Sequence, residues 1–262
     1  MTVRPVRIKL VIAYDGTDFY GWDTQHELRT VRGTLTEAVR LVSDEVVTIR
    51  GSSRTDAGTH AKGQIAHFDT TRPIPSEQWA EVLNRRLPPD VAVLRSDAVP
   101  DHFDSRFCVR SRAYRYRFLI GERDPHRAHF THRFYRQLDL DAMRDAASLL
   151  TGSHDFLAFT EGLEGEVANT VRTLFSVRVS AVRDEVRVDV IGTAFLRGMM
   201  RRISGALLEV GRGQRSVEEV SRLLDPRERE NEQWPIVLPA NGLCLERIRL
   251  TRGFRDTRPP LA

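Results

Sequence analysis

Residues Val46–Phe68 read VVTIRGSSRTDAGTHAKGQIAHF. Two strand-like runs in this stretch, Val46–Ile49 and Gln64–Phe68, flank a polar turn that carries Asp56. Such runs on either side of a segment rich in Gly and Ser predict a strand, a turn and a second strand. The Asp56 carboxylate then has two interpretations. It is either an ordinary turn residue, with Gly58 supplying a positive φ, or a reactive group held out on a rigid loop.

The chain around this stretch continues the mixture of strands and helices. Before it, Arg7–Tyr14 is typical of a buried strand. Thr30 can then cap a helix whose apolar residues recur at helical spacing, namely Val31, Leu35, Ala38, Val39 and Val42. After it, Val91–Val99 is typical of a further strand. The first hundred residues therefore alternate between strands and helices.

The organisation changes near Asp104, where longer elements begin. Phe107–Ile120 predicts a long strand, Val171–Ala181 and Val186–Ile191 predict a hairpin, and Phe195–Val210 predicts a helix with one apolar stripe. We therefore expect an α+β fold with two pseudo-related halves, residues 1–105 and 106–262. Each half should be a mostly antiparallel sheet with helices on one face.

The composition is that of an ordinary globular protein, with 40% hydrophobic and 29% charged residues. No apolar run is long enough for a membrane helix or a signal peptide, so we expect a cytoplasmic protein with no membrane partner. Cys108 and Cys244 are then free thiols, and the spacing of Cys and His predicts no metal site. The net charge of +4 permits a polyanionic partner. Lysine occurs only at Lys9 and Lys62, so the cations are almost all arginine, which suits phosphates and bases but equally fits a genome-wide bias.

A series of short motifs follows in order along the chain. The most specific is Arg54–Ala61, RTDAGTHA. The others are Tyr14-Asp15-Gly16, Tyr20-Gly21-Trp22, Arg106-Phe107, Arg112–Tyr116, Gly152–Phe156, Thr170-Val171-Arg172, Phe195-Leu196, Met199-Met200-Arg201, Glu209-Val210-Gly211 and Pro239–Leu243. Together, from about Lys9 to Leu250, these motifs resemble the TruA family of tRNA pseudouridine synthases.

The resemblance implies isomerisation of uridine within RNA. In that reaction the N-glycosidic bond breaks, the uracil ring turns, and C5 bonds to C1′. The resemblance makes Asp56 the catalytic aspartate and Arg201 the arginine that pairs with it. A cation beside a buried carboxylate favours the charged form, which desolvation alone would disfavour. The helical spacing of Arg201 alone favours a solvated residue on the polar side of the helix.

Three further residues receive roles from the resemblance. Tyr114 corresponds to the active-site tyrosine, which stacks on the target uracil, although its alternating strand also suits a core tyrosine. Arg54 would fill the space that a flipped uridine leaves, or else contact a phosphate or a surface carboxylate. Leu243 or Leu245 would form an apolar wall against the uracil, or simply belong to the core of a strand.

The resemblance also implies a substrate and partners. The substrate is tRNA, with nucleotides 38, 39 and 40 of the anticodon stem-loop as the expected targets. No cofactor is needed, because the isomerisation is redox-neutral and the leaving group is retained. Family members of this type act as homodimers. Asp56 comes from the first half and Tyr114 and Arg201 from the second, so the active-site cleft should lie between the halves.

Several positions depart from the family pattern without removing a catalytic group. Asp23 and Arg32 stand where glutamine is common, Ser53 where glycine is common, Thr59 where valine is common, and Asp104 where histidine is common. The changes at 23, 32 and 104 put the choice of RNA in question. Two rival functions stay open: a non-catalytic RNA-binding protein or tRNA folding factor, and a synthase that acts on acceptor-side stems or on mRNA.

Overall fold

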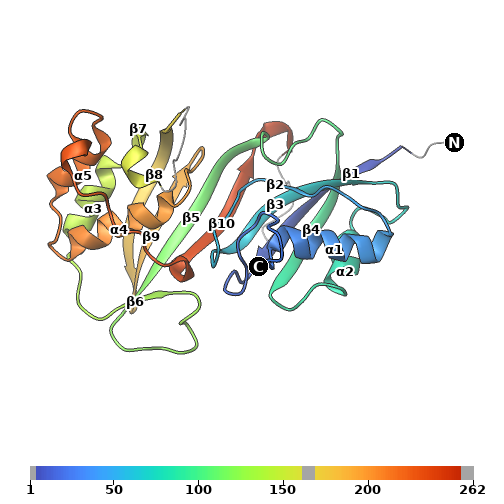
Figure 1. The fold of residues 1–262 in the computed structure, drawn as a ribbon, viewed down its shortest axis with the longest axis horizontal. Coiled ribbons are helices and arrows are strands. Elements are labelled where there is room, and N and C mark those ends of the chain that lie inside the picture. The colour runs from blue at the N-terminus through green and yellow to red at the C-terminus, as the bar shows by residue number, and fades with distance from the viewer. Residues whose placement is uncertain (1–3, 161–168, 255–262) are drawn as a thin grey trace. The chain divides into compact units, whose positions relative to one another are not determined.

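A computed structural model describes residues 4–160 and 169–254 of the chain (Figure 1). Strands and helices are mixed along these residues and the strands pair mostly antiparallel, which confirms the α+β class. The described residues form two compact units. The first contains those up to Ser111 and from Glu246 onward, and the second those within Arg112–Leu245. The division at 105/106 stays a prediction, and its ranges include residues 1–3, 161–168 and 255–262, which lie outside the described residues.

The sheet of the first unit is built around β1 (Val6–Tyr14). It pairs antiparallel with β3 (His60–Thr70) on one side and with β4 (Val91–Val99) on the other. Alternate residues of β1 point to the core, so Ile8, Leu10 and Ile12 are almost fully buried. The helices α1 (Val31–Ser43) and α2 (Trp79–Asn84) lie side by side over one face of these strands (Figure 1).

Helix α1 begins where its sequence predicts. The Thr30 hydroxyl accepts a hydrogen bond from the Gly33 backbone N–H at 3.2 Å, which confirms Thr30 as the N-cap. The apolar stripe expected from the spacing is buried at Val31, Leu35, Ala38 and Val39. The helix ends at Asp44, whose φ of 56° lies in the left-handed region and directs the chain away.

The strand expected at Val46–Ile49 is wrong. That segment has no regular structure, and Val46 is 93% exposed. Pairing with β3 begins only at β2 (Arg50–Gly51), where Arg50 lies opposite His67. The start of the Val46–Ile49 segment is instead held by the Glu45 side chain, which accepts a hydrogen bond from the Thr71 N–H at 3.0 Å. A β-branched run forms a strand only where a neighbouring strand is available to satisfy its backbone.

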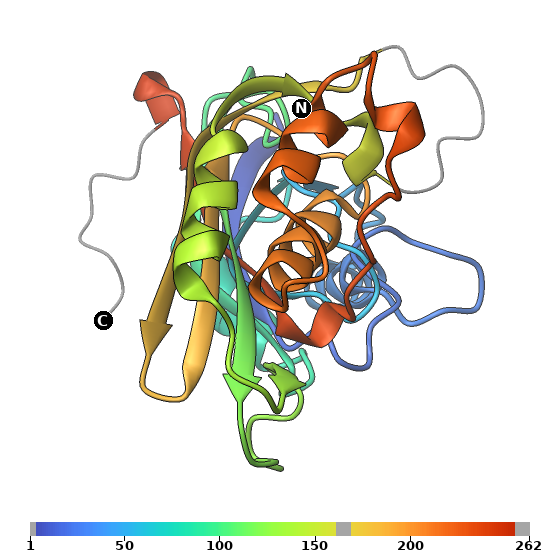
Figure 2. The same cartoon turned by 90° about the vertical axis from the view of Figure 1, so that its left-hand side faces the viewer.

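The sheet of the second unit follows the order β5, β9, β8, β7. These strands span Val109–Ile120, Glu185–Gly192, Val171–Val182 and Gly152–Asp155, and β6 (His132–Phe134) pairs parallel with β5. The expected hairpin is confirmed, with β8 and β9 joined at Arg183, whose φ is 57°. The helices α3 (Leu140–Leu149), α4 (Met199–Gly211) and α5 (Val217–Leu224) pack together beside the strands (Figure 2).

Helix α4 begins later than the sequence predicts. The expected start was Phe195, but Gly198, with a φ of 68°, precedes the first helical residue, Met199. A left-handed residue cannot continue a right-handed helix, so the chain turns here before the helix forms. Nearly all of α4 is buried, which the single apolar stripe expected from the sequence underestimates.

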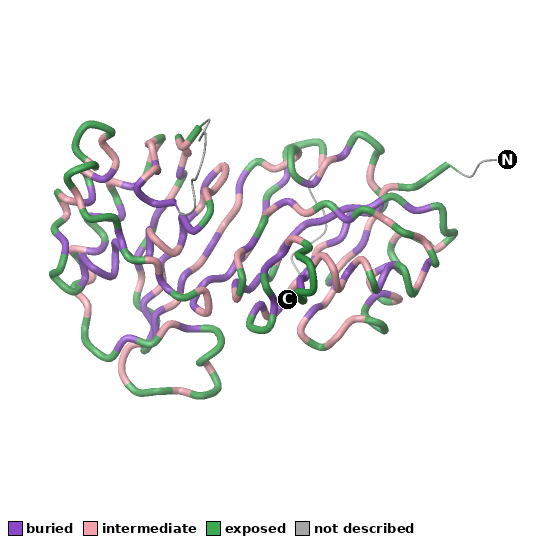
Figure 3. Tube along the Cα trace, viewed as in Figure 1, coloured by how far each residue is buried: buried purple, intermediate pink, exposed green. Residues whose placement is uncertain are grey.

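The remaining regular structure is short. The 3-10 turns span Leu157–Phe159, Arg229–Asn231, Ala240–Gly242 and Arg252–Phe254. In β10 (Leu243–Leu250), the residues up to Leu245 belong to the second unit and the rest to the first. Buried residues run along the strands in both units, while the connecting loops are largely exposed (Figure 3). Within residues 4–160 and 169–254, none of the helices is long and apolar enough to span a bilayer.

Candidate active site

The Asp56 loop runs between β2 and β3, and a second loop in the first unit fixes its backbone. The Trp22 N–H donates to the Thr55 carbonyl at 3.0 Å, and the Gly58 N–H donates to the Phe19 carbonyl at 3.1 Å. The Asp56 carbonyl accepts from the Thr59 N–H at 3.1 Å and closes the turn. Asp56 is therefore flanked on both sides by backbone bonds to the Phe19–Trp22 segment, and it is half-buried itself.

Buried side chains hold the ends of the same loop. Gln64, which is fully buried, donates to the Ser53 carbonyl at 2.6 Å and accepts from the Ser53 N–H at 3.2 Å. The hydroxyl groups of Tyr14 and Thr55 are 2.8 Å apart. These bonds satisfy backbone and hydroxyl groups that an irregular loop cannot pair within itself.

Two glycines allow the second loop to approach the Asp56 loop this closely. A Cβ at Gly16 would lie 2.1 Å from the Thr59 carbonyl oxygen, and one at Gly21 would lie 2.7 Å from the Thr55 oxygen. Gly21 also has a φ of 89°, which disfavours any residue with a Cβ. The Tyr14-Asp15-Gly16 and Tyr20-Gly21-Trp22 motifs therefore form the support of the Asp56 loop.

Arg54 lies on the solvent side of the loop, and its side chain is 73% exposed. Its Nε is 2.7 Å from Oδ2 of Asp23. The other carboxylate oxygen of Asp23 is 2.8 Å from Arg32 NH1. Two of the positions that depart from the family pattern, Asp23 and Arg32, thus form an ion pair with each other and with Arg54.

In the second unit, Tyr114 lies on β5 opposite Val190 of β9. The ring is 6% exposed and packs edge-to-face on Phe195, with the centroids 4.9 Å apart and the planes at 72°. Phe195 is in the irregular segment before α4. This aromatic contact fixes the orientation of the Tyr114 ring.

Tyr116, two residues along β5, is a core residue. Its ring is fully buried and its hydroxyl donates to the Pro239 carbonyl at 2.7 Å. Burial raises the pKa of the Tyr116 phenol, and the nearby Arg201 charge opposes that shift only in part. The phenol is therefore a permanent donor that fastens the segment before β10 to the sheet.

Arg201 lies in the first turn of α4 and is held by the same segment. Its Nε donates to the Leu238 carbonyl at 2.5 Å. Its neighbour Arg202 points elsewhere: NH1 donates to the Pro235 carbonyl at 2.5 Å, and the guanidinium lies over the Trp234 ring at 5.8 Å. The two adjacent arginines therefore have separate surroundings, and only Arg201 lies close enough to Tyr116 to affect its pKa.

The Pro239–Leu243 motif ends this arrangement. The Asn241 amide donates to the carbonyls of Ala128 and Thr131 at 3.0 and 2.8 Å. Leu243 and Leu245 follow in β10 and are 4% and 0% exposed. Tyr114, Arg201 and Leu243 thus belong to one unit, while Asp56 and Arg54 belong to the other. The cleft that would unite them stays a prediction.

Some supporting residues were missed in the sequence. Gln64 was read only as part of a strand, although a fully polar side chain in an otherwise apolar strand is a signal of a buried hydrogen-bonding role. His60 belongs to the Arg54–Ala61 motif, but no role of its own was predicted for it. Its Nδ1 instead accepts a hydrogen bond from the Gly16 N–H at 3.0 Å. Within the residues that the structure describes, there is no cluster of three or more His, Cys, Asp or Glu suited to a metal ion.

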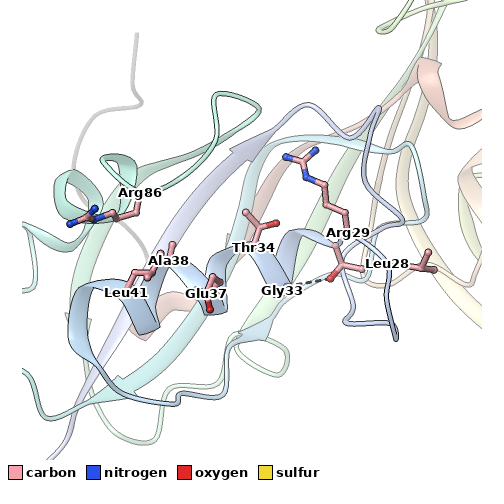
Figure 4. A pocket seen from close by; sticks show the side chains of 9 residues that line it. Leu28, Arg29, Gly33, Thr34, Glu37, Ala38, Leu41 and Arg86 are labelled. Atoms are coloured by element: carbon pink, nitrogen blue, oxygen red, sulfur yellow. Dashed lines mark hydrogen bonds between the residues drawn. The ribbon is translucent and has the colours of Figure 1, made fainter.

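A hollow of about 360 Å³ lies beside α1 in the first unit (Figure 4). Its lining comprises Leu28, Arg29, Thr30, Gly33, Thr34, Glu37, Ala38, Leu41 and Arg86. Arg29 is paired with Asp90 at 2.7 Å and Glu37 with Arg40 at 2.7 Å, so these charges already have partners on the protein. None of the site residues expected from the sequence lines this hollow.

Comparisons with known proteins agree with the motifs. The sequence matches the family described as tRNA pseudouridine synthase over residues 10–108 and 146–250. It is 41% identical to tRNA pseudouridine synthase A of Anoxybacillus flavithermus, covering 85% of this chain and 91% of that protein. It is 40% identical to the protein of the same name from Halalkalibacterium halodurans, covering 94% of each chain. The Clostridium kluyveri protein of that name is 38% identical, covering 92% of this chain and 98% of the relative.

The matched class consists of enzymes that isomerise uridine in RNA. The chain belongs to the tRNA pseudouridine synthase family. A solved structure titled as a Cbf5-Nop10-Gar1 complex aligns over 77% of this chain and 45% of that chain, with 13% identity and a TM-score of 0.33. A similarity that low adds nothing to the assignment.

Proposed function

We propose that the protein isomerises uridine to pseudouridine in the anticodon stem-loop of tRNA, at nucleotides 38, 39 and 40, and that Asp56 is its catalytic residue. The observation that carries the proposal is the support of the Arg54–Ala61 loop, with backbone bonds on both sides of Asp56. A carboxylate on so constrained a loop is preorganised for attack or proton transfer. An ordinary turn aspartate does not require this support.

The reaction needs no external reagent. The bond from N1 to C1′ breaks, a bond from C5 to C1′ forms, the C5 proton is lost and N1 gains a proton. The base remains in the site throughout, so the product nucleotide has the same atoms as the substrate nucleotide. Asp56 acts as the nucleophile or the base in this sequence.

The other site residues have complementary roles in the proposal. Arg201 pairs with Asp56 and keeps it ionised, and the Leu238 carbonyl fixes the direction of its guanidinium. The Tyr114 ring, already oriented by Phe195, stacks on the uracil, and Leu243 provides an apolar wall. Arg54 occupies the space that the flipped uridine leaves in the RNA. These roles require the two units to form one cleft, which is part of the proposal.

The proposal extends to assembly and location. We infer a homodimer in which tRNA contacts both subunits, by analogy with the family. Arginine-rich loops, with Arg54 largely exposed, suit a polyanionic ligand. We infer a cytoplasmic location, because the proposed substrate is tRNA. Separation of the oligomers by size, with light scattering, would test the dimer.

The test of the activity is tritium release from tRNA transcripts that carry [5-³H]uridine. Pseudouridine formation removes the hydrogen at C5, so release measures the proposed bond change directly. We expect stoichiometric release and carbodiimide-dependent primer-extension stops at 38, 39 and 40. RNA binding without release would favour the non-catalytic RNA-binding protein.

Mapping of pseudouridine positions in cellular RNA distinguishes the proposed function from that of a synthase with a different target site. The same primer-extension analysis is applied to tRNA and mRNA from a strain that lacks the protein. We expect pseudouridine to be missing from the anticodon stem-loop alone. Loss of pseudouridine only in acceptor-side stems or in mRNA would contradict the proposed target while leaving the reaction intact.

A further inference from the structure

Asp23 contacts two arginines that are far apart in the sequence. One carboxylate oxygen lies 2.8 Å from Arg32 NH1 and the other lies 2.7 Å from Arg54 Nε. The Asp23 and Arg32 side chains are 30% and 31% exposed, whereas Arg54 is 73% exposed. The cluster therefore has one outward-facing member, and that member adjoins the Asp56 loop.

The backbone explains why these side chains meet. The Trp22 N–H donates to the Thr55 carbonyl at 3.0 Å, and the Trp22 carbonyl accepts from the Arg32 N–H at 3.0 Å. Trp22 thus joins the Asp56 loop to the first turn of α1. Asp23 follows Trp22 and Arg54 precedes Thr55, so their side chains meet beside that junction.

The cluster is fixed at one end and open at the other. Arg32 is held by Asp23 and also by the Thr24 hydroxyl, which accepts from Nε at 2.8 Å. Asp23 is thereby oriented by Arg32 and presents its second oxygen to Arg54. With one carboxylate between two guanidiniums, the cluster has a net charge of +1, so a positive charge remains beside the catalytic loop.

We propose that Asp23 and Arg32 form a positioning pair for Arg54. Asp23 holds the Arg54 guanidinium in place before RNA binds, and Arg32 supplies the charge that stops Asp23 from neutralising Arg54. An ion pair as exposed as that of Arg54 is weak and is screened by salt, so RNA can draw Arg54 away from Asp23. The inference rests on the proposed function, because it explains how Arg54 is positioned for the role proposed for it in the RNA complex.

The two single substitutions should have different effects. In Arg32→Gln, Arg54 is the remaining arginine partner of Asp23, so the carboxylate cancels the Arg54 charge. The affinity for RNA then falls, while the reaction rate at saturating enzyme does not change. In Asp23→Gln, Arg32 and Arg54 repel each other without a counterion. Arg54 then leaves its position, so the rate at saturating enzyme falls while the affinity does not. The double substitution removes one charge of each sign, which restores the net charge and abolishes the repulsion. The glutamine introduced at position 23 can still accept a hydrogen bond from the Arg54 guanidinium through its amide oxygen, so Arg54 keeps a partner that holds it in place.

The experiment is a double-mutant cycle on the full chain. Single-turnover tritium release and the Kd for a tRNA transcript are measured at two salt concentrations. We expect about a two- to fivefold higher Kd for Arg32→Gln and about a two- to fivefold lower rate for Asp23→Gln. The double variant should lie within about twofold of the wild type in both quantities. Thermal unfolding checks that each variant is folded.

Arg40→Gln is the matched control. Arg40 lies on the same helix and pairs with Glu37 at 2.7 Å, so its loss changes the net charge without touching Asp23. We expect no change in Kd or rate. An equal loss of affinity in Arg40→Gln would overturn the inference, because general charge would then explain the effect of Arg32→Gln.

Two outcomes separate this inference from the proposed function. In the first, the wild type releases tritium, but the two single variants and the double variant all behave like it, or the double variant shows the product of the two single effects. The positioning pair is then contradicted, while the proposed enzymatic function stands. If the wild type releases no tritium, the proposed function fails and the inference fails with it. An Arg54→Ala variant that matches the wild type would overturn the inference together with the role proposed for Arg54, while the reaction at Asp56 stands.

Discussion

The Asp56 loop and the Tyr114–Arg201–Leu243 set are positioned in different ways. The loop has no regular structure, and its backbone is bound to the Phe19–Trp22 segment and to the side chain of Gln64. Tyr114 and Leu243 lie on strands, and Arg201 lies on a buried helix. Strands and helices satisfy their own backbone polar groups, whereas a loop depends on partners from elsewhere.

This difference has consequences for how each region responds to substitution. The Asp56 loop depends on a few polar groups and close glycine contacts that no neighbouring element can replace. The second set depends on sheet register and on the packing of many side chains, which tolerate small changes better. Single substitutions in the support of the loop should therefore lower the free energy of unfolding more than similar substitutions of supporting residues in the second unit.

After Asp56 itself, the largest loss of catalytic rate is expected at Arg201. In the proposed site Arg201 is the partner that keeps Asp56 ionised. Removing one member of a buried ion pair costs about 3–5 kcal/mol, which corresponds to roughly 10²–10⁴-fold in rate. We therefore expect Arg201→Ala to lower the single-turnover rate of tritium release by at least about 100-fold. Arg202→Ala is the matched control and should retain the rate within a few fold. Equal losses in both variants would mean that the basic start of α4, rather than Arg201, is what the reaction needs.

Gln64→Leu should have the next largest effect, because it destabilises the Asp56 loop. The substitution leaves the Ser53 N–H and carbonyl without their side-chain partner, at about 1–3 kcal/mol for each group. Tyr116→Phe is the counterpart in the second unit, and it removes one hydrogen bond worth about 1 kcal/mol. Urea unfolding and tritium release should both show a larger loss for Gln64→Leu. A larger loss for Tyr116→Phe would reverse the comparison between the regions.

Gly21→Ala should have a smaller effect with the same origin. The new Cβ would meet the Thr55 oxygen at 2.7 Å and would adopt a φ of 89°, and the cost should exceed about 1 kcal/mol. Gly213→Ala is the control, because Gly213 has a φ of 65° but nothing within 4 Å of the added Cβ. We expect Gly21→Ala to lower the midpoint of thermal unfolding and the rate, and Gly213→Ala to lower the midpoint only slightly. Identical behaviour would show that backbone strain alone, without the close contact, determines both.

Local patterns predicted the elements whose signals lie within the element itself. Thr30 and the apolar stripe after it predicted α1, and the neighbouring strand-like runs Val171–Ala181 and Val186–Ile191 predicted the hairpin of β8 and β9. The patterns failed where contacts with residues distant in the sequence determine the local structure. Val46–Ile49 has the composition of a strand but is not paired with one, and Phe195 lies before the helix and packs on Tyr114.

The candidate site shows the same limit. The Arg54–Ala61 motif located the loop, since its residues are contiguous. Gln64 bonds to Ser53, 11 positions away, and the sequence does not show which residue is its partner. The cluster of Asp23, Arg32 and Arg54 depends on the backbone of Trp22, which joins the segments that carry them. No spacing rule connects residues through such a junction.

The most direct test of the central claim, that the supported loop presents one reactive carboxylate, compares Asp56→Asn with the wild type. The asparagine side chain has nearly the same shape, so the loop and RNA binding should be retained. We expect single-turnover tritium release to fall by at least about 10³-fold, with the Kd for the tRNA transcript within about twofold of the wild type. Release by Asp56→Asn at the wild-type rate would contradict the claim.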